Sequence, residues 1–359
     1  MSASTLLILI CCCLATGASA YNSLFIGYSF FDPVAKQLPK LAEAARQDHT
    51  QTTVFSGGGS GTPIALWHDL KKSAVIKKAL DTGKIELFGM PGWRTVPPPS
   101  KISDPTEGQD LWISYALSKN PKTKFMIGTA WEDFPAKYST AAYTSETRAA
   151  KTVKWWKTFV AQLQAKHPGV TIIDNPYGLG AAELRLLYDA GVVKNVPRMF
   201  GTGIDDRANC MFYDEKGHGG NILHDLLAMF FLNRIYNVDL SAVDFSSALP
   251  WTTDLAKVAK SVLDAYDAGS VCGSDPCSPT AQLQLQTIRA LESKEFAAAE
   301  TIVHWDPSKG CYVKYTQREF MAKFPNFKVS GFSLRAKGSG DNALSTELTR
   351  NKQGKCKGL

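Results

Sequence analysis

The chain has 359 residues, of which 44% are hydrophobic and 20% are charged. This balance provides enough apolar material for one large core or two modest ones, and it excludes a disordered or fibrous protein. The formal net charge of +7 comes mainly from scattered lysines and arginines, which we interpret as solvated helix faces, and we expect no nucleic-acid partner.

The first twenty residues have the pattern of a secretory signal. An apolar run, Leu6–Ala15, is too short to cross a bilayer, and the small residues after it end in Ala18-Ser19-Ala20, an A-x-A cleavage pattern. We therefore predict cleavage after Ala20 and a secreted, extracellular protein, although the opening residues lack Lys and Arg. No later apolar stretch is long enough to predict a membrane span.

From the predicted cleavage site to about residue 240, short apolar runs alternate with longer amphipathic segments. The predicted strands are 24–27, 52–55, 85–88, 124–128 and 170–173. The predicted helices are 34–46, 64–81, 108–118, 145–166, 181–190 and 222–236, the first with Pro39 in its path. This alternation predicts an α/β fold with a mostly parallel sheet, helices on both faces and functional residues at the carboxyl ends of the strands.

The pattern changes after about residue 240. Two helical stretches, 255–268 and 280–299, are followed by an aromatic-rich segment and a basic tail rich in Gly, Lys and Asn. We interpret residues 241–359 as a helical extension that packs on the α/β domain of residues 21–240, in preference to a separate domain.

Of the eight cysteines, three lie in the predicted signal, so five remain: Cys210, Cys272, Cys277, Cys311 and Cys356. An odd number allows at most two disulfides. Cys272 with Cys277 would close a small loop, and Cys311 with Cys356 would tie down the tail, but other pairings are equally compatible with the sequence. The cysteines lack the C-x-x-C or clustered-histidine pattern of a zinc site.

Three segments of the predicted domain carry residue types suited to chemistry. Ser29 follows the first predicted strand in LFIGYSFF. The glycine-rich loop SGGGSGT (56–62) follows the second strand; it matches neither nucleotide-binding glycine pattern, so we expect its backbone N–H groups to approach some other group closely.

The third segment, YDEKGHGG, contains His218 and directly precedes a nearly all-apolar helix that must be buried. Asp214 and Glu215 lie four and three residues before the histidine, where a carboxylate can orient the imidazole. A solvated surface histidine is the alternative interpretation.

LFIGYSFF resembles the first block of the SGNH (GDSL-like) hydrolases, in particular the branch that opens L-F-I-G-N-S-F. VFSGGGSG…LWH is similar to the second block of that branch, and YDEKGHGGNILHDLLAMFF is similar to its last block. The resemblance covers about residues 22–237. It implies a three-layer α/β/α sandwich of the flavodoxin-like SGNH type and an acyl-serine mechanism without cofactor or metal.

The same resemblance implies roles for individual residues. Ser29 would be the nucleophile and His218 the base, with Glu215 or Asp214 as the orienting acid. The backbone N–H groups of Ser29 and Gly58 would bind the oxyanion.

Three features depart from the family pattern. Tyr28 stands where the family has Asp or Asn. The family's acid belongs to a D-x-x-H pattern, three residues before the histidine; here that place holds Glu215, and Asp214 lies one residue further away. No Asn or Gln occurs in ELFGMPGW (86–93), where the third block would provide a side-chain amide to the oxyanion. One such donor is typically worth about 10²–10³ in rate.

The leading hypothesis is a secreted SGNH-type serine esterase, a carboxylic ester hydrolase, with an acyl group on a carbohydrate as one candidate substrate. The alternative is a catalytically inactive SGNH-like protein that binds a glycan or an extracellular protein.

For the remaining candidates the sequence favours structural roles. We expect His224, on the buried helix, to be a hydrogen-bonded core histidine, and Asp205 and Asp206 to shape a turn. The segment Trp131–Asp133 follows the fourth predicted strand, where it would either line the cleft or form a capped turn, and we favour the turn. For Trp67, Trp93 and Trp131, each in or beside a loop at the strand ends, contact with a sugar ring and packing under a loop both remain open.

Overall fold

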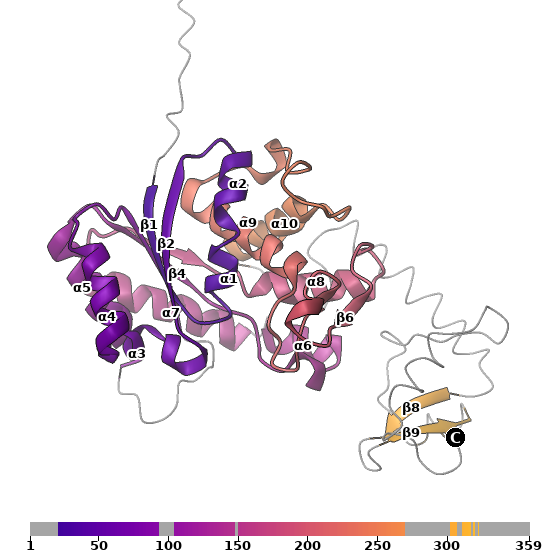
Figure 1. The fold of residues 1–359 in the computed structure, drawn as a ribbon. Helices are drawn as coiled ribbons and strands as arrows, with labels where there is room; N and C mark the ends of the chain where they lie inside the picture. Colours follow the sequence, from indigo (N-terminus) through magenta and orange to yellow (C-terminus); the bar gives the residue numbers. More distant parts are fainter. Residues whose placement is uncertain are drawn as a thin grey trace, which may run out of the picture.

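A computed structural model describes residues 21–92, 104–147, 150–269, 302–306, 311–316, 319 and 322 (Figure 1). The predicted signal, Trp93, the predicted helix 280–299 and the basic tail lie outside the described residues. The suggested cysteine pairs each include a residue outside that part. Cys210, within it, is a buried free thiol.

A five-stranded parallel sheet forms the centre of the molecule. Its strands are β1 (Tyr21–Gly27), β2 (His49–Phe55), β3 (Leu87–Pro91), β4 (Lys124–Gly128) and β5 (Ile172–Asn175), in the order β2-β1-β3-β4-β5. The register aligns Phe25 with Thr53 on one side and with Gly89 on the other. The chain builds the sheet outward in both directions from β1, so the crevice outside the carboxyl ends of β1 and β3 is where such a sheet binds ligands.

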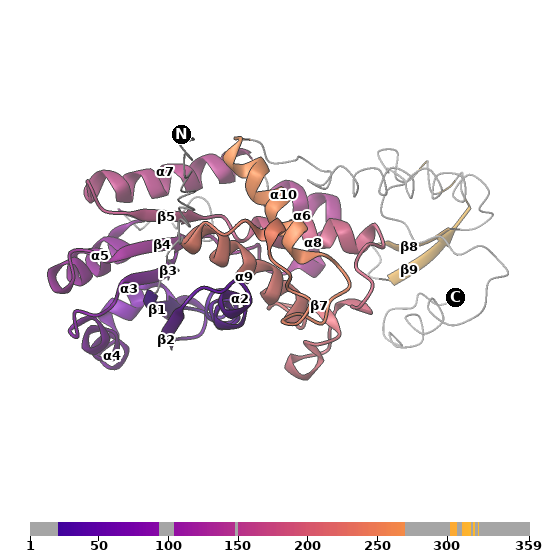
Figure 2. The ribbon, with the colours of Figure 1, turned by 90° about the horizontal axis from the view of Figure 1, so that it is seen from above.

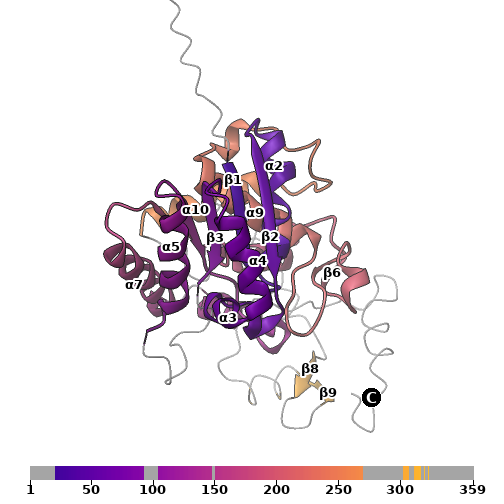
Figure 3. The same cartoon turned by 60° about the vertical axis from the view of Figure 1, so that its left-hand side comes forward.

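Helices cover both faces of this sheet, as predicted (Figure 2). One face carries α3 (Pro63–His68), α4 (Leu70–Leu80), α5 (Glu107–Lys119) and α7 (Ala150–Lys166), and Figure 3 shows this layer from the front. The other face carries α1 (Asp32–Ala35), α2 (Leu38–Ala44) and α9 (Asn221–Tyr236), with α8 (Leu179–Asp189) and α10 (Leu255–Asp267) packed on α9. The α/β fold class is therefore confirmed.

Smaller elements complete the described chain. They are α6 (Thr140–Thr147), the parallel pair β6 (Arg198–Phe200) and β7 (Cys210–Phe212), and the 3₁₀ turns η1 (Gly58–Gly61), η2 (Pro135–Lys137), η3 (Ile204–Asp206) and η4 (Leu240–Ala242). An antiparallel pair, β8 (Ile302–Asp306) and β9 (Cys311–Tyr315), lies within the extension, where the sequence predicted no hairpin. In the described part of the chain, no helix combines the length and the apolar character that crossing a bilayer requires.

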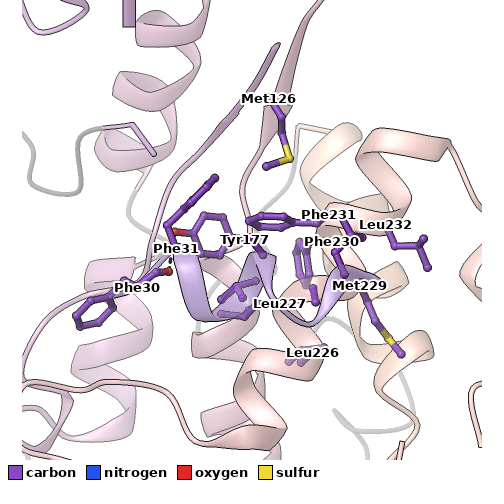
Figure 4. Packing of buried hydrophobic residues seen from close by; sticks show 14 of the residues in the cluster. Phe30, Phe31, Met126, Tyr177, Leu226, Leu227, Met229, Phe230, Phe231 and Leu232 are labelled. Atoms are coloured by element: carbon purple, nitrogen blue, oxygen red, sulfur yellow. Dashed lines mark hydrogen bonds between the residues drawn. The ribbon is translucent and has the colours of Figure 1, made fainter. Parts of the chain in front are cut away.

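Helix α9 is buried in the core, as its apolar sequence predicted. Twelve of its 16 residues are buried. Figure 4 shows the ring of Phe231 packed against those of Phe31 and Tyr177, at centroid distances of 5.3 and 5.2 Å. These contacts join α9 to the segment that follows β1, and so the loop in front of α9 is held near the end of β1.

Two predicted helices are each divided in the structure. The segment 34–46 forms α1 and α2, because Pro39 lies in the first turn of α2, where its missing N–H costs nothing. The segment 64–81 forms α3 and α4. Asp69 lies between them, and its carboxylate accepts hydrogen bonds from the N–H groups of Lys71 and Lys72 and caps α4. Both breaks leave the sheet order and the layers unchanged.

Candidate active site

Ser29 lies in the turn that follows β1, at the carboxyl edge of the sheet. The N–H groups of Phe31 and Asp32 donate to the carbonyl of Tyr28 at 2.9 and 3.0 Å, which closes the turn. The hydroxyl of Tyr177 donates to the carbonyl of Phe30 at 2.9 Å (Figure 4). Tyr28 and Phe30 are buried on either side, while Ser29 is only half-buried. Anchored neighbours thus hold an accessible hydroxyl at the tip of β1.

The imidazole of His218 meets this hydroxyl. Nε2 of His218 is 2.7 Å from Oγ of Ser29, although the two residues are 189 positions apart in the sequence. The ring packs against the rings of Phe30 and Tyr213, whose centroids lie 5.0 and 5.4 Å from its own. The N–H of Gly220 donates to the carbonyl of Met211 at 2.7 Å and closes the base of the loop.

Asp214 contacts the opposite side of the imidazole. Its Oδ2 is 2.6 Å from Nδ1 of His218, and its Oδ1 accepts hydrogen bonds from the N–H groups of Gly217 and His218, both at 3.0 Å. Glu215 is exposed. The sequence did not decide which of the two carboxylates orients the imidazole, and the geometry places Asp214 against the ring. The physical reason is the turn at Gly217, whose φ of 92° folds the chain so that the residue four positions before His218 faces it.

Both ring nitrogens of His218 therefore have a partner. With a proton on Nδ1 donated to Asp214, Nε2 is free to accept the proton of the Ser29 hydroxyl. This arrangement is chemically suited to activating a serine as a nucleophile.

The glycine-rich loop lies beside the tip of β1. The N–H of Ser56 donates to the carbonyl of Gly27 at 3.1 Å. Gly61 is buried, and a Cβ there would lie 2.3 Å from the carbonyl oxygen of Ser56, so only glycine fits this close approach. Gly58 is exposed, with a φ of 54°. Within the described residues, the backbone N–H groups of Ser29 and Gly58 have no hydrogen-bond acceptor, so both can donate to a bound group.

A side-chain amide lies at the end of β3, although it does not come from the segment 86–93. Gln109, on α5, is buried and donates from Nε2 to the carbonyl of Pro91, the last residue of β3, at 2.8 Å. The sequence reasoning missed this residue because it lies 18 positions after Pro91, on a different element.

Trp131 neither lines a cleft nor forms a simple capped turn. It is fully buried, and its indole N–H donates to the carbonyl of Gly217 at 2.8 Å. Asp133 forms an ion pair with Lys216 at 2.7 Å. Trp67 is half-buried and packs edge-on against Trp112 at a centroid distance of 4.7 Å. The preference for a capped turn at 131–133 was wrong: these three residues form no hydrogen-bonded turn, and η2, which follows them, has no side-chain cap.

The structure links neither the aspartates 205 and 206 nor Cys210 by a hydrogen bond to Ser29 or His218. Asp206 accepts a hydrogen bond from the N–H of Thr202 at 3.1 Å and forms an ion pair with Arg198, in keeping with a turn, and Asp205 is exposed. Burial raises the pKa of the Cys210 thiol to about 11. No group of three or more His, Cys, Asp or Glu side chains within the described residues is arranged to hold a metal ion.

His224 is buried as expected, but the prediction of a hydrogen-bonded histidine was wrong. Its Nε2 has no hydrogen-bond partner within the described residues. The reason is the backbone of Gly219, which packs against this nitrogen: a Cβ on Gly219 would lie 2.8 Å from Nε2.

This histidine is expected to make the protein less stable in acid. Burial, together with the charges of Arg207, His218 and Lys40, lowers the pKa of His224 from 6.5 to about 3. Between these values the unfolded chain binds a proton that the folded protein does not, so the free energy of unfolding falls as the pH falls through this range. In His224→Leu, thermal unfolding followed by circular dichroism from about pH 4 to 6.5 should show a flatter dependence of Tm on pH than in the wild type. Equal slopes in the two proteins would contradict this expectation.

Comparisons with known proteins give a likeness of fold only. No family model matches the chain, and no curated protein matches it. A DUF4886 family protein from Bacteroides uniformis is 14% identical over 70% of this chain and 96% of that one, with a TM-score of 0.43. The periplasmic domain of a lipopolysaccharide acetyltransferase from Salmonella ser. Paratyphi A is 13% identical over 61% of this chain and 84% of that one, with a TM-score of 0.36. At these values neither neighbour assigns a function to the chain.

Proposed function

We propose that this protein is a secreted serine esterase of the SGNH type. The observation that carries the proposal is the hydrogen-bonded series Ser29–His218–Asp214, with distances of 2.7 and 2.6 Å. A hydroxyl, an imidazole and a carboxylate linked in this order form the arrangement that lets serine attack a carbonyl carbon.

In the proposed reaction, Oγ of Ser29 attacks the ester carbonyl while its proton passes to Nε2 of His218. Asp214 accepts the hydrogen bond from Nδ1–H and stabilises the imidazolium. The proton is then given to the oxygen of the leaving alcohol, and the acyl group stays on Ser29. Water, deprotonated by His218, releases the acid and restores the serine.

The developing oxyanion requires donors that are already in place. The N–H groups of Ser29 and Gly58 are our assignment, supported by their lack of an acceptor within the described residues. The amide of Gln109 is the candidate for a third donor, because it lies at the end of β3, next to β1 in the sheet. This reaction requires neither a cofactor nor a metal.

We assign catalysis to residues 21–240 and treat residues 241–359 as an extension, whose helix α10 packs on α9. An acyl group on a carbohydrate is a candidate substrate. Secretion is proposed from the apolar N-terminal segment and its A-x-A end at Ala20.

The second candidate is a catalytically inactive protein that binds a glycan or an extracellular protein at the surface around Ser29 and His218. Two observations favour it: Tyr28 stands in place of the family's Asp or Asn, and the third block lacks an amide of its own.

A fluorophosphonate probe separates the two candidates. An activated Ser29 is expected to form a covalent adduct, located by mass spectrometry on the peptide that contains it, because the probe reacts with serines that have an imidazole base. Heat-denatured protein should remain unlabelled. If the folded protein is not labelled at Ser29, the esterase proposal fails and the binding candidate is favoured.

A further inference from the structure

The loop after β4, residues 129–138, touches the neighbours of both Ser29 and His218; we call it the β4 loop. Its Trp131 donates from the indole N–H to the carbonyl of Gly217, at 2.8 Å. The ring of the same tryptophan lies 4.6 Å, centroid to centroid, from that of Phe30. One fully buried side chain therefore contacts the residue after Ser29 and the residue before His218.

Further contacts join the β4 loop to residues 216–217. The N–H of Phe134 donates to the carbonyl of Lys216 at 2.9 Å, and the ammonium of Lys216 is 2.7 Å from the carboxylate of Asp133. Gly217 lies so close to Pro135 that a Cβ on the glycine would be 2.4 Å from the Cδ of the proline. The β4 loop thus holds this turn through both its backbone and its side chains.

The far side of the β4 loop is fixed to α8. The buried guanidinium of Arg185 donates to the carbonyls of Pro135 and Tyr138 at 2.8 and 2.6 Å, and to Oγ1 of Thr140 at 2.9 Å. Helix α8 in turn packs on α9, the helix that follows the His218 loop. Contacts with α8 therefore hold the β4 loop in addition to its contacts with residues 216–217.

Phe134 adopts a φ of 53°, a conformation that bulky residues rarely take. The other described non-glycine residues with positive φ are Arg46 and Asn237, which lie at or just after the ends of α2 and α9, where such values are common. Phe134 instead lies where the β4 loop meets Lys216. Unusual backbone of this kind persists only where its surroundings impose it, and it gathers at functional sites.

We propose that Trp131 is a positioning residue of the active site, which fixes the alignment of His218 with Ser29 without touching a reacting atom. The proposal rests on the proposed function. Its physical basis is that the N–H groups of Gly217 and His218 both donate to Asp214, so a shift of Gly217 would displace the carboxylate and the imidazole together. A misplacement of about 1 Å can cost about a hundredfold in rate.

The test replaces Trp131 with Phe, which keeps a buried ring and removes the N–H donor. We expect kcat for an aryl ester to fall by about tenfold to a hundredfold with KM within about twofold, because alignment and not substrate binding is lost. Trp112→Phe is the matched control: Trp112 is also fully buried, and its indole donates to the backbone carbonyl of Pro63 at 2.9 Å. That control should lose stability and keep kcat.

A second readout does not require catalysis. In Trp131→Phe, hydrogen exchange of the amides of Gly217 and His218 should become about tenfold faster or more, and in Trp112→Phe it should not change. If the wild type hydrolyses no ester while this difference in exchange is present, the esterase proposal fails and the positioning role of Trp131 stands. Unchanged kcat and unchanged exchange in a folded Trp131→Phe protein would overturn the inference, as would equal losses of kcat in both variants.

Should Trp131→Phe fail to fold, Asp133→Asn weakens the neighbouring contact between the β4 loop and residues 216–217, because it removes the charge that pairs with Lys216. Faster exchange at Gly217 in that variant supports the inference, and unchanged exchange overturns it.

Discussion

Replacing Ser29 with Ala is expected to lower kcat for the hydrolysis of a short-chain aryl ester by about 10⁴–10⁶-fold. The methyl group cannot attack a carbonyl, so only the oxyanion donors and substrate binding would continue to act. The side chain of Ser29 is half-buried, and its Oγ bonds to His218 alone among the described residues, so the fold should be kept. The measurement compares purified wild-type and Ser29→Ala proteins, with circular dichroism to verify folding.

The contrary outcome is a similar rate in both proteins. Such a result would mean that the ester reacts with other surface groups, and that the hydrogen bond between Ser29 and His218 has no catalytic consequence. The glycan-binding candidate would then be preferred and examined on a sugar array.

Asp214→Asn is expected to lower kcat by about 10⁴-fold, and Glu215→Gln to change it by less than about twofold. One carboxylate oxygen of Asp214 contacts Nδ1 of His218. The other oxygen accepts hydrogen bonds from the backbone N–H groups of Gly217 and His218. An amide in its place can keep the backbone contacts only by presenting its NH₂ group to the ring, which selects the wrong tautomer of the histidine. Glu215, which is exposed, lacks any such contact within the described residues.

The two variants are matched, since each removes one negative charge from adjacent positions of the same loop. A general effect of charge would therefore lower both rates alike. A large loss in Glu215→Gln with little change in Asp214→Asn would reverse our assignment and favour the spacing of three residues that is typical of the SGNH family.

The sequence determined the α/β architecture, because burial of strands and helices leaves local periodic patterns. The strand 124–128 was predicted with the bounds that the structure has, and the helix 222–236 with an error of one residue at its start. The same reasoning identified Ser29 and His218 as candidates, because each lies in a short loop next to a buried element. Their approach to 2.7 Å follows from the packing of α9 on the segment after β1, which holds the loop of His218 beside the tip of that strand.

Only the tertiary structure decided which groups complete the site. The choice of Asp214 over Glu215 depends on the turn at Gly217, whose backbone angles a residue pattern does not specify. Trp131 reaches Gly217 across 86 positions, and Gln109 reaches β3 from a separate helix. Such contacts leave no periodic signal along the chain, because they are determined by how loops from different elements pack and not by the burial of any one of them.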